Sequence, residues 1–396
     1  MLSTIVHATA VTPAAVVEDA TIAIEDGRIA GIRDRSGPEP DALDARGAVV
    51  MPGMVDLHSD AIEQQLMPRL NVRFPPPLAF AEVDRLLAGS AITTCFHAIS
   101  LMLGRARTVA WAEETHDVVL AERARALVRH ELHLRCELPQ QESLEAVLRL
   151  LALGGTRAVS AMDHTPGQGQ FRDADWYRRH QLGTGHLSEQ EVDQAVARAD
   201  EAAALLLGEE ARERLRRLGA AAREHDALLL SHDDDEPERV RLVHASGARV
   251  SEFPITVAAA RAARELGMHV CMGAPNVVRG VSTGGHLSAR EAIALGVVDA
   301  LVSDYHPASM LRAVFALAAD DVLPLPDAVA LATGNPARAA GLADRGTLAE
   351  GGLADLVVVE HRGILPSAIA TVVGGRLTAS FQAPPPAVRE TAGVPA

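Results

Sequence analysis

Short apolar runs alternate with helical stretches through the middle of the chain, and this alternation constrains the fold more than any other feature of the sequence. Between about residues 51 and 344, the segments that separate the apolar runs are rich in Ala, Leu, Arg and Glu. Strands that alternate with helices are typical of parallel α/β sheets. Eight strands are expected, ending near Asp60, His97, Glu137, His164, His232, Glu252, Pro275 and Asp304. The sequence therefore predicts an α/β fold in which residues 51–344 form a (β/α)8 TIM-like barrel.

The two ends of the chain have a different pattern, with short strands joined by tight turns. Asp26-Gly27 separates two runs of strand character, and Asp-Gly in that position is a strong hairpin signal. Similar short strands recur near the other terminus. We therefore expect residues 1–50 and 345–385 to form one small β-domain beside the barrel, and residues 386–396 to form a loose tail.

Charge and composition limit the classes of partner. The 396-residue chain has a net charge of -15, and an acidic protein does not attract nucleic acid or anionic membranes, because phosphate groups select basic surfaces. The sequence shows neither a signal peptide nor an apolar span long enough to cross a membrane. The 3 cysteines lie apart in apolar runs, which predicts reduced thiols. We expect a cytoplasmic protein with a small-molecule substrate, and leave open a homo-oligomer.

Side chains of metal-ligand type occur where the predicted strands end. His58 and Asp60 lie two residues apart on the first barrel strand, so both point to the same face. In a barrel, the C-terminal ends of the strands share one rim and supply the active site. The candidate ligands are His58, Asp60, Glu137, His164, His232 and Asp304. This set is large enough for two divalent ions, and mixed nitrogen and oxygen ligands favour Zn, with Mn or Fe(II) as alternatives.

The absence of lysine narrows the chemistry of this site. All 37 basic residues are Arg, which excludes a Schiff base, a P-loop lysine and a carbamylated lysine between metals. Glu137 is therefore the expected bridging carboxylate. In a plainer interpretation, each His after a strand is structural and Asp233, Asp234 and Asp235 cap the next helix. Six ligand-type residues at strand ends favour the metal site.

A glycine-rich stretch over residues 273–291 follows the seventh predicted strand. It ends in Ser288-x-x-Glu291, a capping-box pattern that also occurs at Ser188-x-x-Glu191. A glycine-rich loop that leads into a helix N-terminus can hold an anion, and phosphate often binds at this place in barrels. A long flexible loop is the alternative. The expected substrate contacts are Arg69, Asn276, Arg279, Gly280, Gly284 and Gly285.

Other histidines are assigned by their position in the sequence. His97 and His306 lie near strand ends, and we expect them to face the substrate or to support the ligands. Six others are expected at the surface: His7, His116, His130, His180, His225 and His361.

Several motifs taken together resemble one enzyme family. They are His58-x-Asp60 after Pro-Gly, Glu63-Gln-Gln-Leu-Met-Pro-Arg69, Leu-Arg-Cys-Glu137-Leu, Met-Asp-His164-Thr-Pro-Gly-Gln168, Ser-His232-Asp-Asp, Ser-Glu252-Phe-Pro, Met-Gly-Ala-Pro-Asn276-Val-Val-Arg-Gly280 and Ser-Asp304-Tyr. This combination spans nearly the whole chain and resembles the amidohydrolase-superfamily diphosphatases of phosphonate catabolism. Those enzymes act on α-D-ribose 1-methylphosphonate 5-triphosphate and release diphosphate. The resemblance implies a metal-dependent hydrolase in which the six candidate ligands include the general base, Asp304.

The chain departs from the family pattern at positions expected to bind anions. Gln64, Gln65 and Gly169 stand where the resemblance implies basic residues, and His306 also differs from the residue expected after Ser-Asp-Tyr. These departures predict a substrate with less negative charge than a triphosphate. Hydrolysis of the C–N bond of an amide, cyclic amide or amidine is the alternative reaction. A metal-stabilised scaffold without activity is a third interpretation.

Overall fold

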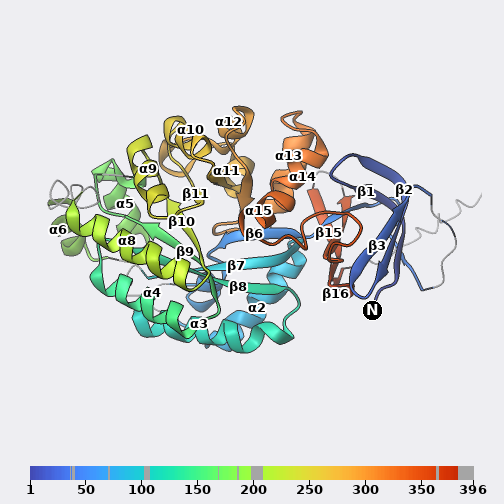
Figure 1. The fold of residues 1–396 in the computed structure, drawn as a ribbon, viewed down its shortest axis with the longest axis horizontal. Coiled ribbons are helices and arrows are strands. Elements are labelled where there is room, and N and C mark those ends of the chain that lie inside the picture. Colours follow the sequence, from blue (N-terminus) through green and yellow to red (C-terminus); the bar gives the residue numbers. More distant parts are fainter. Residues whose placement is uncertain are drawn as a thin grey trace, which may run out of the picture.

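Eight parallel strands surrounded by helices form the centre of the molecule (Figure 1). The structure is a computed structural model that describes residues 1–35, 37, 41–69, 72–101, 108–167, 169–184, 187–197, 208–362 and 365–381. Within these residues the strands are β6 (Met54–Ser59), β7 (Ile92–Ser100), β8 (Arg129–Glu137), β9 (Thr156–Met162), β10 (Leu228–His232), β11 (Val250–Glu252), β12 (His269–Gly273) and β13 (Ala300–Val302). Each strand pairs in parallel with the next, which confirms the predicted barrel.

The outside of the barrel is covered by helices whose apolar faces pack against the strands. These are α1 (Ala61–Leu66), α2 (Pro76–Gly89), α3 (Val109–Glu122) with a 3-10 turn η1 (Arg123–Arg125), α4 (Gln141–Leu153), α8 (Glu209–Glu224), α9 (Pro237–Ala245), α10 (Val257–Glu265), α11 (Ala274–Arg279), α12 (Ala289–Ala294), α13 (Ser309–Ala319), α14 (Leu325–Ala330) and α15 (Gly334–Ala339). Helix α4 shows the pattern, because Leu144, Val147 and Leu151 recur at helical spacing and all three are buried. This packing fixes the strands to which the site residues are attached.

Strand β8 shows how the sequence sends side chains to two sides of the barrel wall. Leu132, Leu134 and Cys136 belong to the core between strands and helices. The alternate residues, His133, Arg135 and Glu137, point to the other face because the side-chain period of a strand is two. One short segment therefore supplies both the outer core and polar groups to the interior.

The barrel closes between its first and last strands through a short seam. Ser59 and Asp304 form an isolated parallel bridge, in which the Asp304 amide donates to the His58 carbonyl at 2.9 Å. The Asp60 amide in turn donates to the Asp304 carbonyl at 2.7 Å. Asp56 adds a side-chain link, because its Oδ1 accepts from the Ser303 amide at 3.0 Å. The seam therefore brings together two sequence-distant candidate site residues, Asp60 and Asp304.

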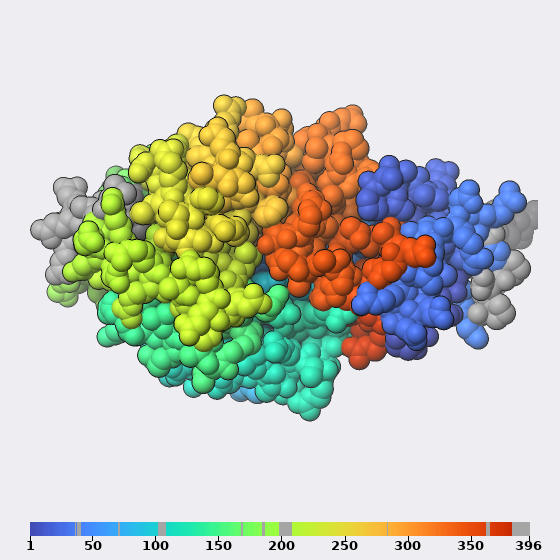
Figure 2. Space-filling model, viewed as in Figure 1, coloured from blue at the N-terminus to red at the C-terminus, as the bar shows by residue number. Residues whose placement is uncertain are grey.

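Strands from both ends of the chain form a second, mostly antiparallel sheet beside the barrel (Figures 1 and 2). Its order is β16-β15-β14-β5-β1-β2-β3, with β4 paired to β1. The strands are β1 (Thr4–Val11), β2 (Val16–Glu25), β3 (Arg28–Arg33), β4 (Leu43–Asp44), β5 (Val49–Pro52), β14 (Leu356–Arg362), β15 (Leu365–Val373) and β16 (Arg376–Ser380). This sheet confirms the predicted pairing of the two termini.

One local prediction is confirmed in the terminal sheet. Asp26 and Gly27 both have positive φ, 49° and 75°, as a tight hairpin between β2 and β3 requires. Between β5 and β6, a Cβ on Gly53 would lie 2.2 Å from the Thr93 side chain, so this position has room for glycine alone. The domain limits at residues 50 and 345 stay a prediction, and the predicted tail lies outside the described residues.

An insertion after β9 forms a small cap with its own apolar cluster. It contains the 3-10 turn η2 (Gly169–Phe171), α5 (Ala174–Thr184) and α6 (Glu189–Ala197). Phe171, Tyr177 and Val192 are buried together in this cluster. The Ser188 amide donates to Glu191 Oε2 at 2.7 Å, and the Glu191 amide to Ser188 Oγ at 3.3 Å, which confirms the predicted capping box at the start of α6.

Two further expectations concern cysteines and membranes. All three cysteines, Cys95, Cys136 and Cys271, are buried and free, as predicted. Among the helices of the described residues, none combines the length and apolar character that crossing a membrane demands.

Candidate active site

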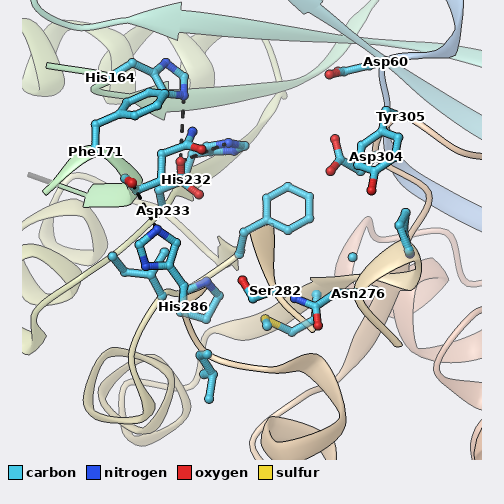
Figure 3. Close-up of a pocket in the computed structure, with 18 of the residues that line it drawn as sticks. Asp60, His164, Phe171, His232, Asp233, Asn276, Ser282, His286, Asp304 and Tyr305 are labelled. Atoms are coloured by element: carbon cyan, nitrogen blue, oxygen red, sulfur yellow. Dashed lines mark hydrogen bonds and ion pairs between the residues drawn. The ribbon is translucent and has the colours of Figure 1, made fainter. Parts of the chain in front are cut away.

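A cavity of about 320 Å³ lies at the C-terminal ends of the barrel strands (Figure 3). Its volume is in the range of small-molecule sites. Six of the residues predicted for the site line it: Asp60, His164, His232, Asn276, Arg279 and Asp304. The barrel rim therefore gathers side chains from strands that are far apart in the sequence, as the fold predicts.

His58, Asp60 and Asp304 form the first group of ligand-type atoms, all within 4.8 Å of one another. His58 Nε2 lies 3.5 Å from Asp60 Oδ1, and this buried nitrogen makes no hydrogen bond within the described part of the chain. An unpaired buried nitrogen beside two carboxylates is the arrangement that a divalent cation would satisfy.

His164, His232 and Asp233 form a second group with the same spacing. Asp233 Oδ2 lies 3.8 Å from His164 Nε2 and 3.7 Å from His232 Nε2, and it is buried without a hydrogen-bond partner among the described residues. The two groups adjoin, because the His58 and His232 ring centroids are 5.3 Å apart. The donor set fits two neighbouring divalent ions.

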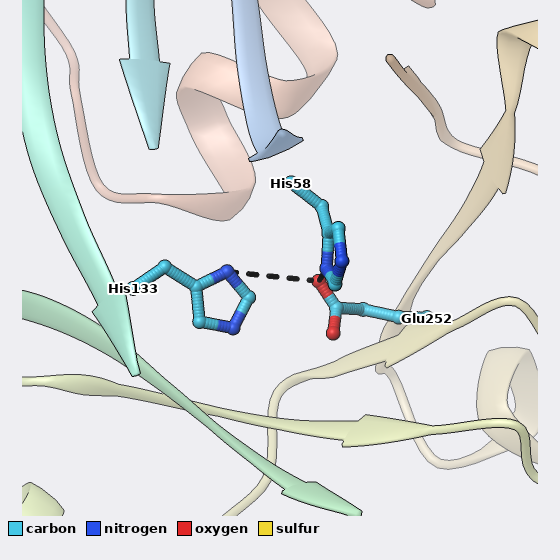
Figure 4. Close-up of side chains that lie close together, drawn as sticks. All are labelled: His58, His133 and Glu252. Atoms are coloured by element: carbon cyan, nitrogen blue, oxygen red, sulfur yellow. Dashed lines mark hydrogen bonds and ion pairs between the residues drawn. The ribbon is translucent and has the colours of Figure 1, made fainter. Parts of the chain in front are cut away.

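Glu252 bonds to one histidine of each group, His58 and His232, and Figure 4 shows its carboxylate beside His58 and His133. Its fully buried carboxylate accepts from His58 Nδ1 at 3.0 Å, from His232 Nδ1 at 3.3 Å and from Ser160 Oγ at 2.7 Å. Burial acts to raise the pKa of Glu252, but the charges of His58 and His133 hold it well below its usual range. Because Nδ1 of both histidines donates to Glu252, each Nε2 is left for the cavity side.

His133 completes a hydrogen-bonded network around Glu252. His58, His133 and Glu252 also have ligand-type atoms within 4.8 Å. However, His133 Nδ1 is bonded to the Leu57 carbonyl at 3.0 Å, and its Nε2 lies 2.5 Å from Ser160 Oγ. Both ring nitrogens are therefore in use, and we interpret His133 as a support for the site.

Glu137 stands behind His164 in the structure. Its Oε1 accepts from the His164 amide at 2.7 Å and its Oε2 from His164 Nδ1 at 2.8 Å. Burial acts to raise the pKa of Glu137, but the His164 side chain and amide lower it below its usual range. Both oxygens thus orient His164 here, and the bridging role of Glu137 stays a prediction.

Asp304 combines acid–base character with a constrained backbone. Burial, together with the nearby Asp60 carboxylate, raises its pKa to about 7. Asp304 has φ 52°, and two other cavity residues that follow strands, Asp233 and Phe253, have φ 54° and 53°. Left-handed conformations are unfavourable for side chains such as Phe, and such residues gather at functional sites. The conformations are held by backbone bonds, for example from the Phe253 amide to the Cys271 carbonyl at 2.8 Å.

Arg135 brings a positive charge to the cavity wall. Its side chain is 11% exposed, and its Nη1 donates to Asp60 Oδ1 at 2.9 Å. Its Nε donates to Met162 Sδ at 3.3 Å. A cation is thus fixed beside one of the predicted metal ligands.

The glycine-rich stretch is organised differently from the predicted loop. Helix α11 begins directly after β12 and ends at Gly280 with φ 75°, so Asn276 and Arg279 lie on a helix. Asn276 Oδ1 accepts from the Ala289 amide at 3.0 Å, and Arg279 Nη1 donates to Tyr305 OH at 3.3 Å. Ser288 does occupy the N-cap of α12, but its side chain makes no capping hydrogen bond, so the second predicted capping box is wrong.

The other predicted substrate contacts are not among the residues that line the cavity. These are Arg69, Gly280, Gly284 and Gly285, and their role stays a prediction. The positions that depart from the family pattern, Gln64, Gln65, Gly169 and His306, are likewise not among the lining residues. Gln168 lies outside the described residues.

The cap covers one side of the cavity. Gln170, Phe171, His180 and Gln181 line it from this insertion. His286 Nε2 donates to the Gln170 carbonyl at 3.0 Å, which ties the segment before α12 to the cap. The cap therefore contributes to the shape of the site.

The prediction that six histidines lie at the surface is wrong for three of them. His116 and His130 are buried, and His180 lines the cavity. His97 is buried too, with its Nε2 2.7 Å from His130 Nδ1, while His130 Nε2 lies 3.0 Å from Asp84 on α2. This chain of bonds lies between β7, β8 and a helix and does not line the cavity.

Asp233, Glu252 and Arg135 are functional candidates that the sequence reasoning did not assign. Glu252 ends its strand just as the predicted ligands do, so the same signal identifies it. Arg135 lies two residues before Glu137 on β8, so strand periodicity places both on one face. The alternative in which Asp233 caps the next helix is not supported, because α9 begins at Pro237 and has Glu236 as its N-cap.

An eight-stranded barrel with histidines and carboxylates gathered at its strand ends defines a hydrolase of the metal-dependent TIM-barrel type. The chain belongs to the amidohydrolase family, whose model matches residues 168–391. It is 35% identical over 354 residues to the α-D-ribose 1-methylphosphonate 5-triphosphate diphosphatase of Escherichia coli (strain K12), and the match covers 87% of this chain and 92% of that protein.

Solved structures support the fold assignment. A 5-methylcytosine deaminase from Klebsiella pneumoniae, liganded with phosphonocytosine, has a TM-score of 0.65 at 14% identity, and the match covers 96% of this chain and 98% of that one. A D-hydantoinase has a TM-score of 0.60 at 16% identity, with 95% of each chain covered. At these identities the similarity is one of fold.

Proposed function

We propose that this hydrolase cleaves a phosphoanhydride bond in a small phosphorylated molecule and releases diphosphate. The observation that carries the proposal is the similarity to the Escherichia coli diphosphatase along nearly its whole length. The cavity supports it with two arginines, Arg135 and Arg279, on its wall. Guanidinium groups are well suited to phosphate oxygens because they donate in a planar, bidentate geometry.

We further propose that two divalent metal ions bind at the rim, with Zn expected and Mn or Fe as alternatives. His58, Asp60 and Asp304 would hold one ion, and His164, His232 and Asp233 the other. The unpaired buried atoms His58 Nε2 and Asp233 Oδ2 support this assignment. Bound divalent metals would supply Lewis-acid stabilisation of negative charge and lower the pKa of a nearby water.

Asp304 is the proposed general base. Its carboxylate accepts one proton from water as the water oxygen forms a bond to phosphorus. The bond from phosphorus to the bridging oxygen breaks, and that oxygen leaves with the electron pair as part of diphosphate. Asp304 then returns the proton to the departing oxygen. In the metal-free protein the pKa of Asp304 is raised to about 7, chiefly by burial, which is near the pH at which a general base works best.

A side-by-side assay tests the proposal. Metal-supplemented protein is incubated with a ribose 5-triphosphate and with cyclic amides, and products are followed by 31P NMR and by chromatography. Diphosphate release that depends on added metal and is lost in Asp304→Asn supports the proposal. Turnover of a cyclic amide without diphosphate release from any phosphoanhydride would refute it.

A second candidate is C–N hydrolysis of a less charged substrate. It is favoured by Gln64, Gln65 and Gly169, where the family resemblance implies cations. Each charge-assisted hydrogen bond to an anion contributes about 1.5–3 kcal/mol, so losing two or three weakens triphosphate binding by several powers of ten. The kcat/KM for the triphosphate, its monophosphate analogue and an uncharged cyclic amide decides this point. A triphosphate preferred by a wide margin would contradict the expectation of a less charged substrate.

A further inference from the structure

Arg135 has more N–H donors than its protein partners accept. A guanidinium carries five N–H donors. Within the described residues, Arg135 bonds through Nη1 to Asp60 Oδ1 and through Nε to Met162 Sδ. Nη2 has no acceptor among these residues, although Arg135 lines the cavity. Three of the five N–H groups are thus available to something that enters the cavity.

The orientation of Arg135 is fixed before any substrate binds. It extends from β8, in register with Ser100 on β7 and Ser160 on β9. The Asp60 carboxylate and the Met162 sulfur hold two of its nitrogens, so the plane of the guanidinium is set by two elements of the barrel. Donors held in place by the fold stabilise developing charge without reorganisation at the moment of reaction.

The charge of Arg135 is as permanent as its position. A guanidinium keeps its proton in proteins, and here it is paired with the Asp60 carboxylate at 2.9 Å. The group therefore remains a cation in a cavity whose other charged residues include Asp60, Asp233 and Asp304. An anionic group that approaches the proposed base, Asp304, would be repelled by these carboxylates, and Arg135 is a cation beside them that can offset the repulsion.

We propose that Arg135 is a catalytic residue that donates hydrogen bonds to the anionic oxygens of the group undergoing hydrolysis. This inference rests on the proposed function and specifies it further. The substrate class is one that presents a phosphoryl or similar anionic oxygen at the reacting centre. The water oxygen still forms the new bond, and Asp304 still takes the proton; Arg135 neither gains nor loses one.

The alternative is that Arg135 has a purely structural role, and the variants must distinguish that role from the catalytic one. Arg135 also holds Asp60, a proposed metal ligand, so a variant that lost metal would lose activity for another reason. Arg135→Lys keeps a positive charge and the length of the side chain but loses the planar fork. Arg135→Ala opens a space that a free guanidinium ion can enter. Arg149→Met is a matched control, because Arg149 pairs with Glu113 at the surface and its side chain is 56% exposed.

The experiment measures three quantities on metal-loaded protein. They are metal content by elemental analysis, the Kd for inorganic diphosphate by calorimetry, and turnover with and without guanidinium ion at concentrations too low to denature. We expect Arg135→Ala to bind diphosphate at least about tenfold more weakly and to lose kcat by about a hundredfold or more, as removal of one charge-stabilising donor does. Guanidinium, but not an equal concentration of sodium chloride, should restore part of the rate.

The outcomes distinguish this inference from the function on which it rests. If wild-type protein hydrolyses none of the substrates, the proposed function fails, while the diphosphate affinities still test Arg135. Unchanged diphosphate affinity and turnover in Arg135→Lys and Arg135→Ala would overturn the inference. Loss of metal in Arg135→Ala, together with wild-type diphosphate affinity and kcat in Arg135→Lys, would also overturn it and assign Arg135 to the positioning of Asp60.

Discussion

Replacement of Glu252 with Gln tests whether this residue acts by orienting the site histidines rather than by binding a metal itself. The carboxylate accepts from Nδ1 of both His58 and His232, and from Ser160 Oγ. An amide of the same shape keeps one acceptor oxygen and turns the other into a donor. At least one histidine must then lose its acceptor or shift its proton to Nε2, and a protonated Nε2 cannot bind a metal.

The size of the effect follows from the number of bonds lost. A hydrogen bond to a charged group contributes about 1.5–3 kcal/mol, and loss of the partner that orients a ligating histidine lowers metal affinity by about 10–100-fold. We therefore expect Glu252→Gln to bind the proposed metals about 10–100-fold more weakly, which equals about 1.4–2.7 kcal/mol. The metal-free variant should also unfold at a lower temperature, since His58 and His232 no longer share one buried acceptor.

Competition with a chromophoric chelator measures the metal affinity, and circular dichroism reports the fold and its thermal unfolding. Glu131→Gln is the control. Glu131 also lies on a barrel strand, but its carboxylate pairs with Arg123 at a distance of 3.8 Å and does not line the cavity. Wild-type metal affinity in a correctly folded Glu252→Gln protein would refute the assignment of Glu252 as the group that orients the histidines.

Three further predictions address the base, the metals and stability. Asp304→Asn should keep the fold and lose turnover on the order of a hundredfold or more, measured as kcat under saturating substrate; near-normal kcat would place the base elsewhere. In the metal-free protein, burial acts to lower the pKa of His58, but the Glu252 carboxylate raises it, to about 10 overall. A metal must then displace that proton at neutral pH, so metal affinity should rise with pH by about tenfold per unit, and chelator competition at pH 6, 7 and 8 that shows no rise would contradict this. Burial acts to raise the pKa of Asp84, but hydrogen bonds from His130 and two backbone amides lower it below its usual range. Its stabilising contribution is therefore present above the unfolded pKa of about 3.9 and is lost as the pH falls through the folded value. Asp84→Asn should lower the unfolding free energy by about 1–3 kcal/mol at pH 7 and have less effect in acid, as urea unfolding at both pH values will show.

The barrel and most of the candidate site follow from local patterns in the sequence. All the predicted strand ends except Pro275 are marked by an apolar run that stops at a polar residue, and barrel geometry then places those residues on one rim. His58, His164, His232 and Asp304 could be selected in this way because each comes at or just after its strand. The hydrogen-bond partners of these residues could not be predicted, because the sequence does not show which strand-end groups bond to each other.

The residues that sequence reasoning left unassigned have contacts that depend on the three-dimensional fold. Glu252 reaches His58, which lies 194 positions away in the sequence. His130, which is expected at the surface from the sequence, is instead directed by β8 towards Asp84 on α2 and is buried there. The glycine-rich stretch suggested a loop, yet Ala274–Arg279 forms a helix, with Pro near its start and Gly280 at its end.

The seam between β6 and β13 means that the site is completed only after the last barrel strand has been synthesised. Asp304 meets His58 and Asp60 through backbone bonds that join positions more than 240 residues apart. Such contacts form late, because a long intervening segment must first become ordered. A chain that stops before β13 contains His58 and Asp60 but lacks Asp304, the proposed base. If the proposed roles are correct, turnover requires closure of the barrel, because only β13 brings Asp304 to the other two residues.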